Sequence, residues 1–442
     1  MPVAQRQVEL RHQLLDRLST ARANTDALFS IVKPEALYDR PIPERHRIVF
    51  YIGHLEAFDW NLLRERALSL GSFHPEFDRL FAFGIDPVGG GLPTDQPGDW
   101  PTMDVVRAYV AEARQTLDEA LEDQLADEHP GKENLTLLLQ VAIEHRLMHA
   151  ETLAYMLHQL PLDRKVKPSG MPEAVTAPVK PFMVRIPAGS VTLGLSRQDP
   201  TAFGWDNEFE AHTVDVSAFS IDRYKVTNGE FLEFMKASGY EKPDFWSRSD
   251  WEWRVSSGIT HPGFWIKRDN EWHLRTMFSE VPLPMDWPVY VSQAEAFAFA
   301  RRAGKSLPTE AQWQRAAYGT PEGEERQYPW GIDAPSAKRG NFDFERWDPT
   351  SVAAHPESTN AFGVADLLGN GWEWTLTPFG PFPGFEPFPF YRGYSADFFD
   401  NKHFVMKGGS PRTAACMLRR SFRNWFQSHY PYVYAGFRCV SH

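Results

Sequence analysis

The sequence predicts a two-domain protein, with an N-terminal four-helix bundle followed by an α+β domain rich in loops. At 442 residues the chain is longer than a single hydrophobic core usually supports. Apolar residues recur at helical spacing through about the first 160 residues, whereas the remainder shows short apolar runs, turn residues and many tryptophans. A segment rich in proline and lysine separates these two parts. We therefore expect domains at 1–163 and 181–442, joined by a linker at 164–180.

Four helices are predicted in the N-terminal domain. Each shows apolar residues three or four positions apart, and together they cover 9–31, 43–69, 102–124 and 133–160. The connection from 73 to 100 contains several glycines and prolines, so it is predicted to be a loop with no element of its own. Four long helices with one longer connection are typical of a four-helix bundle.

The C-terminal domain has a different pattern. Only two segments, 228–238 and 292–303, have a clear helical pattern. The remaining short apolar runs are separated by turn residues, which indicates short strands and long loops. This combination is typical of an α+β domain.

Charge and composition exclude several classes of partner. The chain has 46 lysines and arginines against 58 aspartates and glutamates, a formal charge of −12, and it has no block of basic residues. We therefore expect neither nucleic acid nor an anionic membrane as a partner. The chain has only two cysteines, and its N-terminus lacks a signal-peptide pattern, which favours a cytoplasmic protein. It has no run of about 18 apolar residues, so no membrane span is expected.

Three histidines form a candidate metal site. His145 and His149 are four residues apart, so one helix face carries both imidazoles and one metal ion can reach both. Arg146 stands where a zinc protease of the helix-borne two-histidine type requires glutamate, which excludes that class. A hydrogen-bonded pair without metal is the alternative for an isolated helix. His54, in an apolar segment of another predicted helix, makes a metal the better explanation.

A site with three imidazoles keeps coordination positions open, as catalytic sites do. Nitrogen ligands alone are compatible with zinc, iron or copper. Glu151 lies about 200° around the helix from His149, so it is not expected to be a ligand. Its expected role is a contact to the site or an ion pair.

Seven motifs of the C-terminal domain resemble, in order, those of the formylglycine-generating-enzyme family. They lie at 183–190, 221–228, 303–313, 328–331, 360–374, 408–410 and 436–438. The resemblance implies a C-type-lectin-like fold with little regular secondary structure. Formylglycine formation in that family uses two cysteines, whereas the corresponding positions here hold Thr413 and Arg423. That chemistry is therefore not expected, because a fold does not by itself specify an activity.

The N-terminal histidine pattern resembles the metal-binding bundle called DinB-like. A DinB-like bundle followed by a formylglycine-type domain resembles the ergothioneine sulfoxide synthases. This resemblance implies that His54, His145 and His149 hold Fe(II). It also implies an O2-dependent reaction that joins a thiol sulfur to the imidazole C2 of Nα-trimethylhistidine and leaves a sulfoxide.

Two C-terminal segments, 390–399 and 421–426, resemble motifs of the same synthases. Reducing O2 requires a proton donor, which the resemblance assigns to Tyr391 or Tyr394. A trimethylammonium group favours an aromatic face, which Trp425 or the tyrosine pair can supply. Arg423 and Asn424 are candidates to bind a substrate carboxylate.

The chain departs from the synthase pattern at three places. Met148 stands where glutamine is common, Phe426 stands where aspartate is frequent, and the loop at 84–92 lacks the paired arginines of enzymes that use γ-glutamylcysteine. We therefore predict a smaller thiol, with cysteine the simplest candidate, although selenium or another sulfur donor stays open. The alternatives are a metal-dependent thiol transferase and a binding module with a structural metal.

Overall fold

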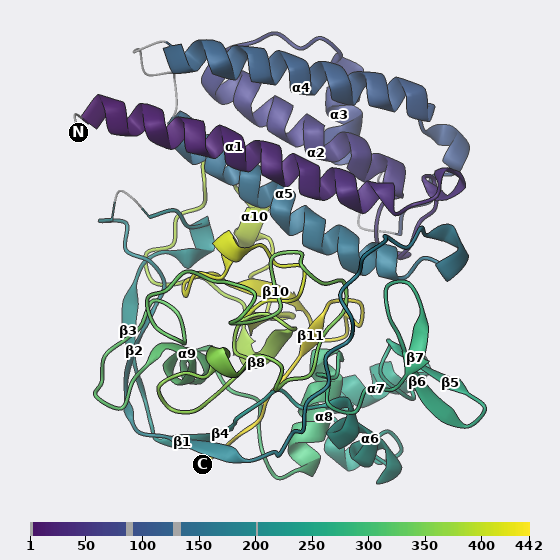
Figure 1. Ribbon diagram of the computed structural model, residues 1–442, viewed down its shortest axis with the longest axis vertical. Coiled ribbons are helices and arrows are strands. Elements are labelled where there is room, and N and C mark those ends of the chain that lie inside the picture. The colour runs from purple at the N-terminus through teal and green to yellow at the C-terminus, as the bar shows by residue number, and fades with distance from the viewer. Residues whose placement is uncertain (1–2, 85–91, 127–133, 200–201) are drawn as a thin grey trace. The chain divides into compact units, whose positions relative to one another are not determined.

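A computed structural model describes residues 3–84, 92–126, 134–199 and 202–442 (Figure 1). The chain divides into two compact units, 1–169 and 170–442, and the division falls inside the predicted linker. The first part of this linker belongs to the N-terminal unit, because Lys165 forms a bridge with Val32. Its later part belongs to the C-terminal unit, because Arg346 Nη1 donates to the carbonyl oxygen of Glu173 at 2.7 Å.

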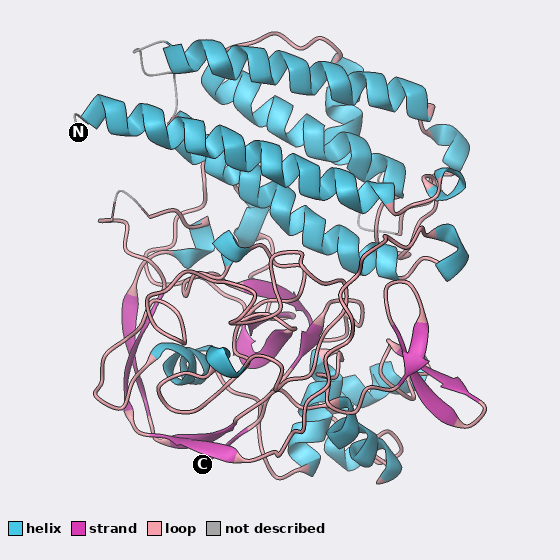
Figure 2. Cartoon of the chain, viewed as in Figure 1, coloured by secondary structure: helices cyan, strands magenta, loops and turns pink. Residues whose placement is uncertain are grey.

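The N-terminal unit is a helical bundle, as predicted (Figures 1 and 2). Its helices are α1 (Val3–Ser30), α2 (Ile48–Leu63), α3 (Pro75–Phe83), α4 (Met103–Ala126) and α5 (Leu135–His158). Helix α5 packs against α1 and α2, and α4 packs against α2. Most side chains of α2 and α5 are buried, so polar groups on these two helices lie inside the bundle.

The prediction that 73–100 contains no element is wrong, because α3 lies there. The imidazole Nδ1 of His74 accepts a hydrogen bond from the main-chain N–H of Phe77 at 3.3 Å, and Pro75 occupies the first helical position. Both features start a helix. Phe77, Leu80 and Phe81 do follow a helical spacing, but the segment lies within a connection rich in glycine and proline and is therefore predicted as loop. The predicted loop at 84–92, which lacks the paired arginines of enzymes that use γ-glutamylcysteine, falls largely on 85–91, outside the described residues.

The C-terminal unit consists largely of loops, with short strands (Figure 2). Its strands are β1 (Met183–Ile186), β2 (Gly189–Leu193), β3 (His212–Val216), β4 (Phe219–Asp222), β5 (Trp265–Arg268), β6 (Glu271–Arg275), β7 (Glu280–Pro282), β8 (Trp372–Pro378), β9 (His403–Lys407), β10 (Asn424–Gln427), β11 (Ala435–Gly436) and β12 (Val440–Ser441). They form sheets in the orders β1-β4-β12, β10-β9-β8-β11, β2-β3 and β5-β6-β7. The predicted fold class, a bundle joined to an α+β domain, is confirmed.

Short helices connect these strands. They are α6 (Asn228–Lys236), α7 (Arg248–Ser256), α8 (Gln293–Arg302), α9 (Glu310–Tyr318) and α10 (Gly393–Ala396). Helices α6 and α8 match the two predicted segments, but the prediction missed α7, α9 and the four-residue α10. Helix α7 has no fully buried side chain and so shows no apolar stripe, and the apolar positions of α9 are mostly alanine. Both helices nevertheless begin with a capping side chain, Ser247 or Thr309.

Several family motifs build the core of the C-terminal unit. Glu373 of β8 accepts hydrogen bonds from Trp313 Nε1 at 2.8 Å and from Arg438 Nε at 2.6 Å. Lys225 Nζ lies 3.4 Å from the same carboxylate. All four side chains are almost completely buried, so the charges compensate one another inside the fold. These motif residues therefore serve as scaffold, and the chemistry must come from other residues.

Candidate metal centre and aromatic site

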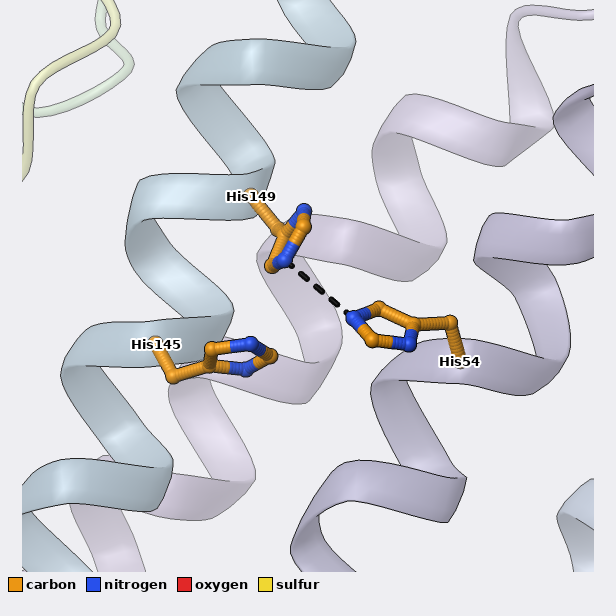
Figure 3. Close-up of side chains that lie close together, drawn as sticks. All are labelled: His54, His145 and His149. Carbon is orange, nitrogen blue, oxygen red and sulfur yellow. Dashed lines mark hydrogen bonds between the residues drawn. The ribbon is translucent and has the colours of Figure 1, made fainter. Parts of the chain in front are cut away.

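The three predicted ligands meet inside the N-terminal unit. His54 extends from α2, and His145 and His149 extend from α5, with the three rings turned toward one another (Figure 3). One nitrogen atom from each ring lies within 4.8 Å of the others. The Nε2 atoms of His54 and His149 are 3.3 Å apart. The prediction of a His54–His145–His149 cluster therefore agrees with the geometry.

Helix α3 orients the first of these ligands. The main-chain carbonyl oxygen of Phe81 lies 2.7 Å from His54 Nδ1, and a carbonyl can only accept, so Nδ1 carries the proton. The lone pair of His54 is then on Nε2, which faces His149. A carbonyl in this position is the usual partner of a metal-binding histidine, because it fixes both tautomer and ring orientation. Sequence analysis missed this contact, since it comes from a segment predicted as loop.

A buried ionic network next to the histidines ties α2 to α5. Arg146 is fully buried and donates to Asp59 at 2.6 Å and to Glu56 at 3.0 Å. Its Nη2 also donates to the carbonyl oxygen of Leu55 at 2.9 Å. Arg114 of α4 binds the same Glu56. Because Arg146 follows His145 and Leu55 follows His54, this network fixes the spacing between the two ligand-bearing turns.

The surroundings keep the imidazoles neutral. Burial lowers the pKa of His54 to about 4. Burial also holds the pKa of His145 and His149 well below the usual range, and the neighbouring imidazoles lower it further. Phe58 stacks on His145 with ring centroids 3.4 Å apart, and Phe50 stacks on His54 at 4.8 Å. Neutral imidazole is the form that binds metal, so all three histidines can coordinate a metal ion at neutral pH.

The cluster fits a divalent transition metal. Three neutral nitrogen donors converge, with His145 buried and His54 and His149 half-buried, and Nδ1 of His149 has no hydrogen-bond partner among the described residues. Within the described residues no other group of histidine, cysteine or carboxylate side chains with this spacing is found. Three protein ligands leave positions for exogenous molecules. Met148, the predicted substrate contact beside His149, is half-buried on α5, and its role stays a prediction.

In the C-terminal unit, the structure brings together aromatic residues from both predicted segments. Tyr391 precedes α10, Tyr394 lies within it, and Trp425 lies on β10. The ring centroids of Tyr391 and Tyr394 are 5.4 Å apart, and those of Tyr394 and Trp425 are 5.5 Å apart. Phe379 stacks on Trp425 at 4.1 Å. The two predicted segments therefore form one aromatic cluster, and its binding of a cation stays a prediction.

The other predicted substrate residues have identified partners within the unit. Arg423 is buried, and its Nε and Nη2 donate to Glu310 at 2.9 and 3.1 Å. This pairing engages the guanidinium in the fold, and the predicted contact of Arg423 with a substrate carboxylate stays untested. Asn424 Oδ1 accepts from the main-chain N–H of Trp425 at 2.8 Å. Phe426 stacks on Tyr430 with centroids 5.0 Å apart.

A short 3-10 turn, η5 (Asp206–Glu208), was not singled out from the sequence. It contacts both predicted segments. Asp206 accepts a hydrogen bond from Ser395, and Glu208 accepts one from Ser421 at 2.6 Å. The signal available in the sequence was three consecutive polar residues after Trp205, which alone do not distinguish a buried turn from a solvated loop.

The two positions that correspond to the formylglycine cysteines do not carry thiols. Thr413 is buried, and its hydroxyl oxygen accepts from the main-chain N–H of Ser410 at 2.8 Å. Arg423 pairs with Glu310 as described. Cys416 is exposed and Cys439 is buried. Among the helices of the described residues, none has the length and hydropathy needed to cross a membrane.

Comparison with known proteins agrees with this arrangement. Residues 17–153 match the DinB superfamily, and residues 169–442 match the family described as Sulfatase-modifying factor enzyme 1-like domain. The chain is 34% identical to a hercynine oxygenase of Mycolicibacterium smegmatis, over 97% of this chain and 98% of that protein. It is 33% identical to a hercynine oxygenase of Mycolicibacterium thermoresistibile, over 97% and 94%. Ergothioneine biosynthesis protein 1 of Neurospora crassa is 29% identical over 92% of this chain and 55% of that protein.

Proposed function

Since the chain belongs to the hercynine oxygenase family and is an oxidoreductase, we propose that it is an Fe(II)- and O2-dependent sulfoxide synthase of ergothioneine biosynthesis. Its proposed substrates are Nα-trimethylhistidine (hercynine), a thiol and O2. The observation that carries the proposal is the cluster of His54, His145 and His149 in a chain that matches this family over almost its whole length.

The proposed reaction balances without another reductant. A C–S bond forms at imidazole C2, the C2–H and S–H bonds break, and the sulfur gains one oxygen atom. These changes remove four electrons from the organic substrates, which is the number that reduces O2. One oxygen atom ends in the sulfoxide, and the other leaves as water with the two protons released from carbon and sulfur.

The three histidines would hold the Fe(II). When bound, iron supplies the redox chemistry that couples O2 reduction to oxidation of the sulfur. Neutral imidazoles add no negative charge, and three of them leave room for the thiol and O2. The hydrogen bond from His54 to Phe81, the ionic network of Arg146 and the stacked Phe58 would keep the three rings in position and limit access of water.

Tyr391 is the proposed proton donor. Burial raises the pKa of its phenol, and the nearby Asp206 carboxylate raises it further, so the hydroxyl stays protonated at neutral pH. Tyr394 is the less suitable donor because its ring is buried, stacked on Trp205 at 4.1 Å and packed against the edge of Trp425. A protonated phenol can supply a proton to a developing oxygen anion.

Trp425 is the proposed contact for the trimethylammonium group. Quaternary ammonium groups bind over the faces of aromatic rings, where the quadrupole is negative, and bind more strongly where water is excluded. Phe379, stacked on Trp425, would fix the orientation of the indole ring. Asn424 would then present its amide N–H2 to the substrate carboxylate, since its side-chain oxygen already accepts from the main chain.

Cysteine is the proposed thiol. Phe426 offers no negative charge to a substrate ammonium group, and its ring is stacked on Tyr430. The stretch that would carry the paired arginines, 84–92, contains none. A γ-glutamyl group would therefore lack partners for its charged ends.

Anaerobic reconstitution tests the proposal. The purified full chain is loaded with Fe(II), mixed with trimethylhistidine and cysteine, and exposed to O2 while uptake and products are followed. The expected result is one O2 consumed for each sulfoxide formed, with the mass of the coupled product. Thiol transfer without O2 uptake would instead support a metal-dependent thiol transferase. O2 uptake without coupling of cysteine would indicate a different sulfur donor.

A further inference from the structure

The turn η5 (Asp206–Glu208) links the two segments that carry the proposed active-site aromatics. Asp206, Asn207 and Glu208 are each at most 1% exposed, although the turn lies in a loop-rich region. Trp205 immediately before the turn is also fully buried. Burying carboxylates is unfavourable unless hydrogen bonds or counter-charges compensate them, so the contacts of this turn are informative.

One side of the turn holds the tyrosine segment. Ser395, in α10 directly after Tyr394, donates its hydroxyl hydrogen to Asp206 Oδ1. Asn207 Nδ2 donates to the same Ser395 hydroxyl oxygen at 3.0 Å. Trp205 stacks on Tyr394 with centroids 4.1 Å apart and contacts the edge of Tyr391 at 6.5 Å. The hydroxyl of Ser395 is therefore fixed from both sides by neighbouring residues of one turn.

The other side of the turn holds the segment that leads into β10. Ser421 Oγ donates to Glu208 Oε2 at 2.6 Å, and Arg419 Nε donates to the same carboxylate at 2.8 Å. Arg423 Nη1 donates to the carbonyl oxygen of Asn207 at 3.2 Å. The contacts hold every second residue of the stretch just before Asn424, namely Arg419, Ser421 and Arg423. Glu208 therefore holds the segment that leads directly into Asn424 and Trp425.

We propose that Asp206 and Glu208 are positioning residues for the reaction, Asp206 acting through Ser395 on Tyr391 and Tyr394, and Glu208 acting through Ser421 on Trp425. This proposal rests on the proposed function. A purely stabilising turn could be built more easily from apolar residues, because buried carboxylates carry a desolvation cost. Directional hydrogen bonds instead specify one arrangement of the two segments, and small displacements of catalytic groups lower rates steeply.

Two single substitutions separate the two sides of the turn. Ser395→Ala removes the hydroxyl bound by Asp206, and we expect kcat to fall about 10- to 100-fold while KM for trimethylhistidine changes less than about threefold. Ser421→Ala removes the hydroxyl bound by Glu208, and we expect KM for trimethylhistidine to rise about tenfold with a smaller change in kcat. The opposite pattern, or equal changes in both constants for both variants, would overturn the proposal.

A conservative pair tests whether the hydrogen-bond acceptor is what matters. Asp206→Asn keeps an oxygen at Oδ1 for Ser395, whereas Asp206→Ala removes it. Asp206→Asn should therefore retain a kcat at least about tenfold above that of Asp206→Ala. Equal kcat values for the two variants would contradict a role through Ser395.

Ser358→Ala is the matched control for loss of a buried hydroxyl. Ser358 lies in the same unit, is 1% exposed, and its Oγ accepts from the main-chain N–H of Asp366 at 3.0 Å. The Ser358→Ala variant should lower Tm as much as Ser395→Ala and Ser421→Ala do, while leaving kcat and KM unchanged. A wild-type chain that forms no sulfoxide would refute the proposed function itself. A fully active wild type with unaffected Ser395→Ala and Ser421→Ala would refute only the positioning role.

Discussion

Arg146 and Asp59 form a salt bridge at 2.6 Å between two side chains that are completely buried. The bridge joins α5 to α2 beside the histidine cluster, one residue after His145 and five after His54. An isolated charge in this environment would be strongly unfavourable, so each partner depends on the other. Stability and metal binding should therefore be coupled through Arg146.

We expect Arg146→Met to lower the free energy of unfolding by about 3–5 kcal/mol, because Asp59 loses its buried counter-charge, whereas Glu56 keeps Arg114. Urea denaturation measures this loss, and metal analysis of the folded fraction should show reduced iron. Arg248→Met is the control, since Arg248 forms an exposed pair with Glu252 and should cost less than about 1 kcal/mol. An Arg146→Met protein with unchanged stability would contradict the structural role of the network.

Single replacement of His54, His145 or His149 by alanine should sharply reduce iron content and abolish O2 consumption, because each removes one of three donors. Iron per chain and O2 uptake with both substrates are the two measurements. His212→Ala in the C-terminal unit is the control and should retain iron and activity. Full iron content in His54→Ala would remove that residue from the site.

The contact between α2 and α3 can be tested at Gly53. A Cβ atom at this position would lie 2.3 Å from Cδ1 of Phe81, whose ring is buried. Gly53→Ala should displace α3 and with it the carbonyl that orients His54, at about 1–3 kcal/mol in stability. Iron affinity, measured by titration with a competing chelator, should fall about 10- to 100-fold.

Gly71→Ala is the control for Gly53→Ala, since no atom lies within 4 Å of a Cβ placed there. It should leave stability and iron affinity close to those of the wild type. Equal iron affinity in the two glycine variants would show that the carbonyl of Phe81 is dispensable.

The thiol preference follows from the missing charged groups. Each charge-assisted hydrogen bond that γ-glutamylcysteine cannot make is worth about 1.5–3 kcal/mol, so two should favour cysteine about 100-fold or more in kcat/KM. The comparison is made at saturating trimethylhistidine and O2, and the sulfoxide product is quantified because uncoupled thiol oxidation would distort the ratio. A clear preference for γ-glutamylcysteine would mean that other cations bind the glutamyl group.

The pKa of Tyr391 predicts how stability and kcat depend on pH above neutrality. Burial, and then the charge of Asp206, raises this pKa above its ordinary value, so the protonated phenol is favoured in the folded protein. Its contribution to stability is present below about pH 10 and is lost above it as the phenol ionises. Tyr391→Phe should therefore lower kcat by one constant factor from about pH 6 to about pH 9. A factor that falls steadily across this range would indicate an ionising Tyr391 and contradict the donor assignment.

The sequence alone determined the features that depend on local geometry. The helical period placed His145 and His149 on one face of α5, and the apolar surroundings of His54 predicted its burial on a second helix. The fold class followed from the change in pattern near residue 164 and from motifs that occur in a fixed order. These features repeat over several turns or motifs, which makes them visible without knowledge of distant contacts.

Only the tertiary structure decided which polar groups support the sites. Helix α3 was missed because its nine residues stand in a connection rich in glycine and proline, yet its Phe81 carbonyl orients His54. The turn Asp206–Glu208 lies almost 190 residues from Ser395 and more than 200 from Ser421, and nothing local predicts that they meet. The pairing of Arg423 with Glu310, 113 residues away, likewise has no local signal in the sequence. A hydrogen bond between distant residues depends on how the whole chain closes, so local propensity carries no information about it.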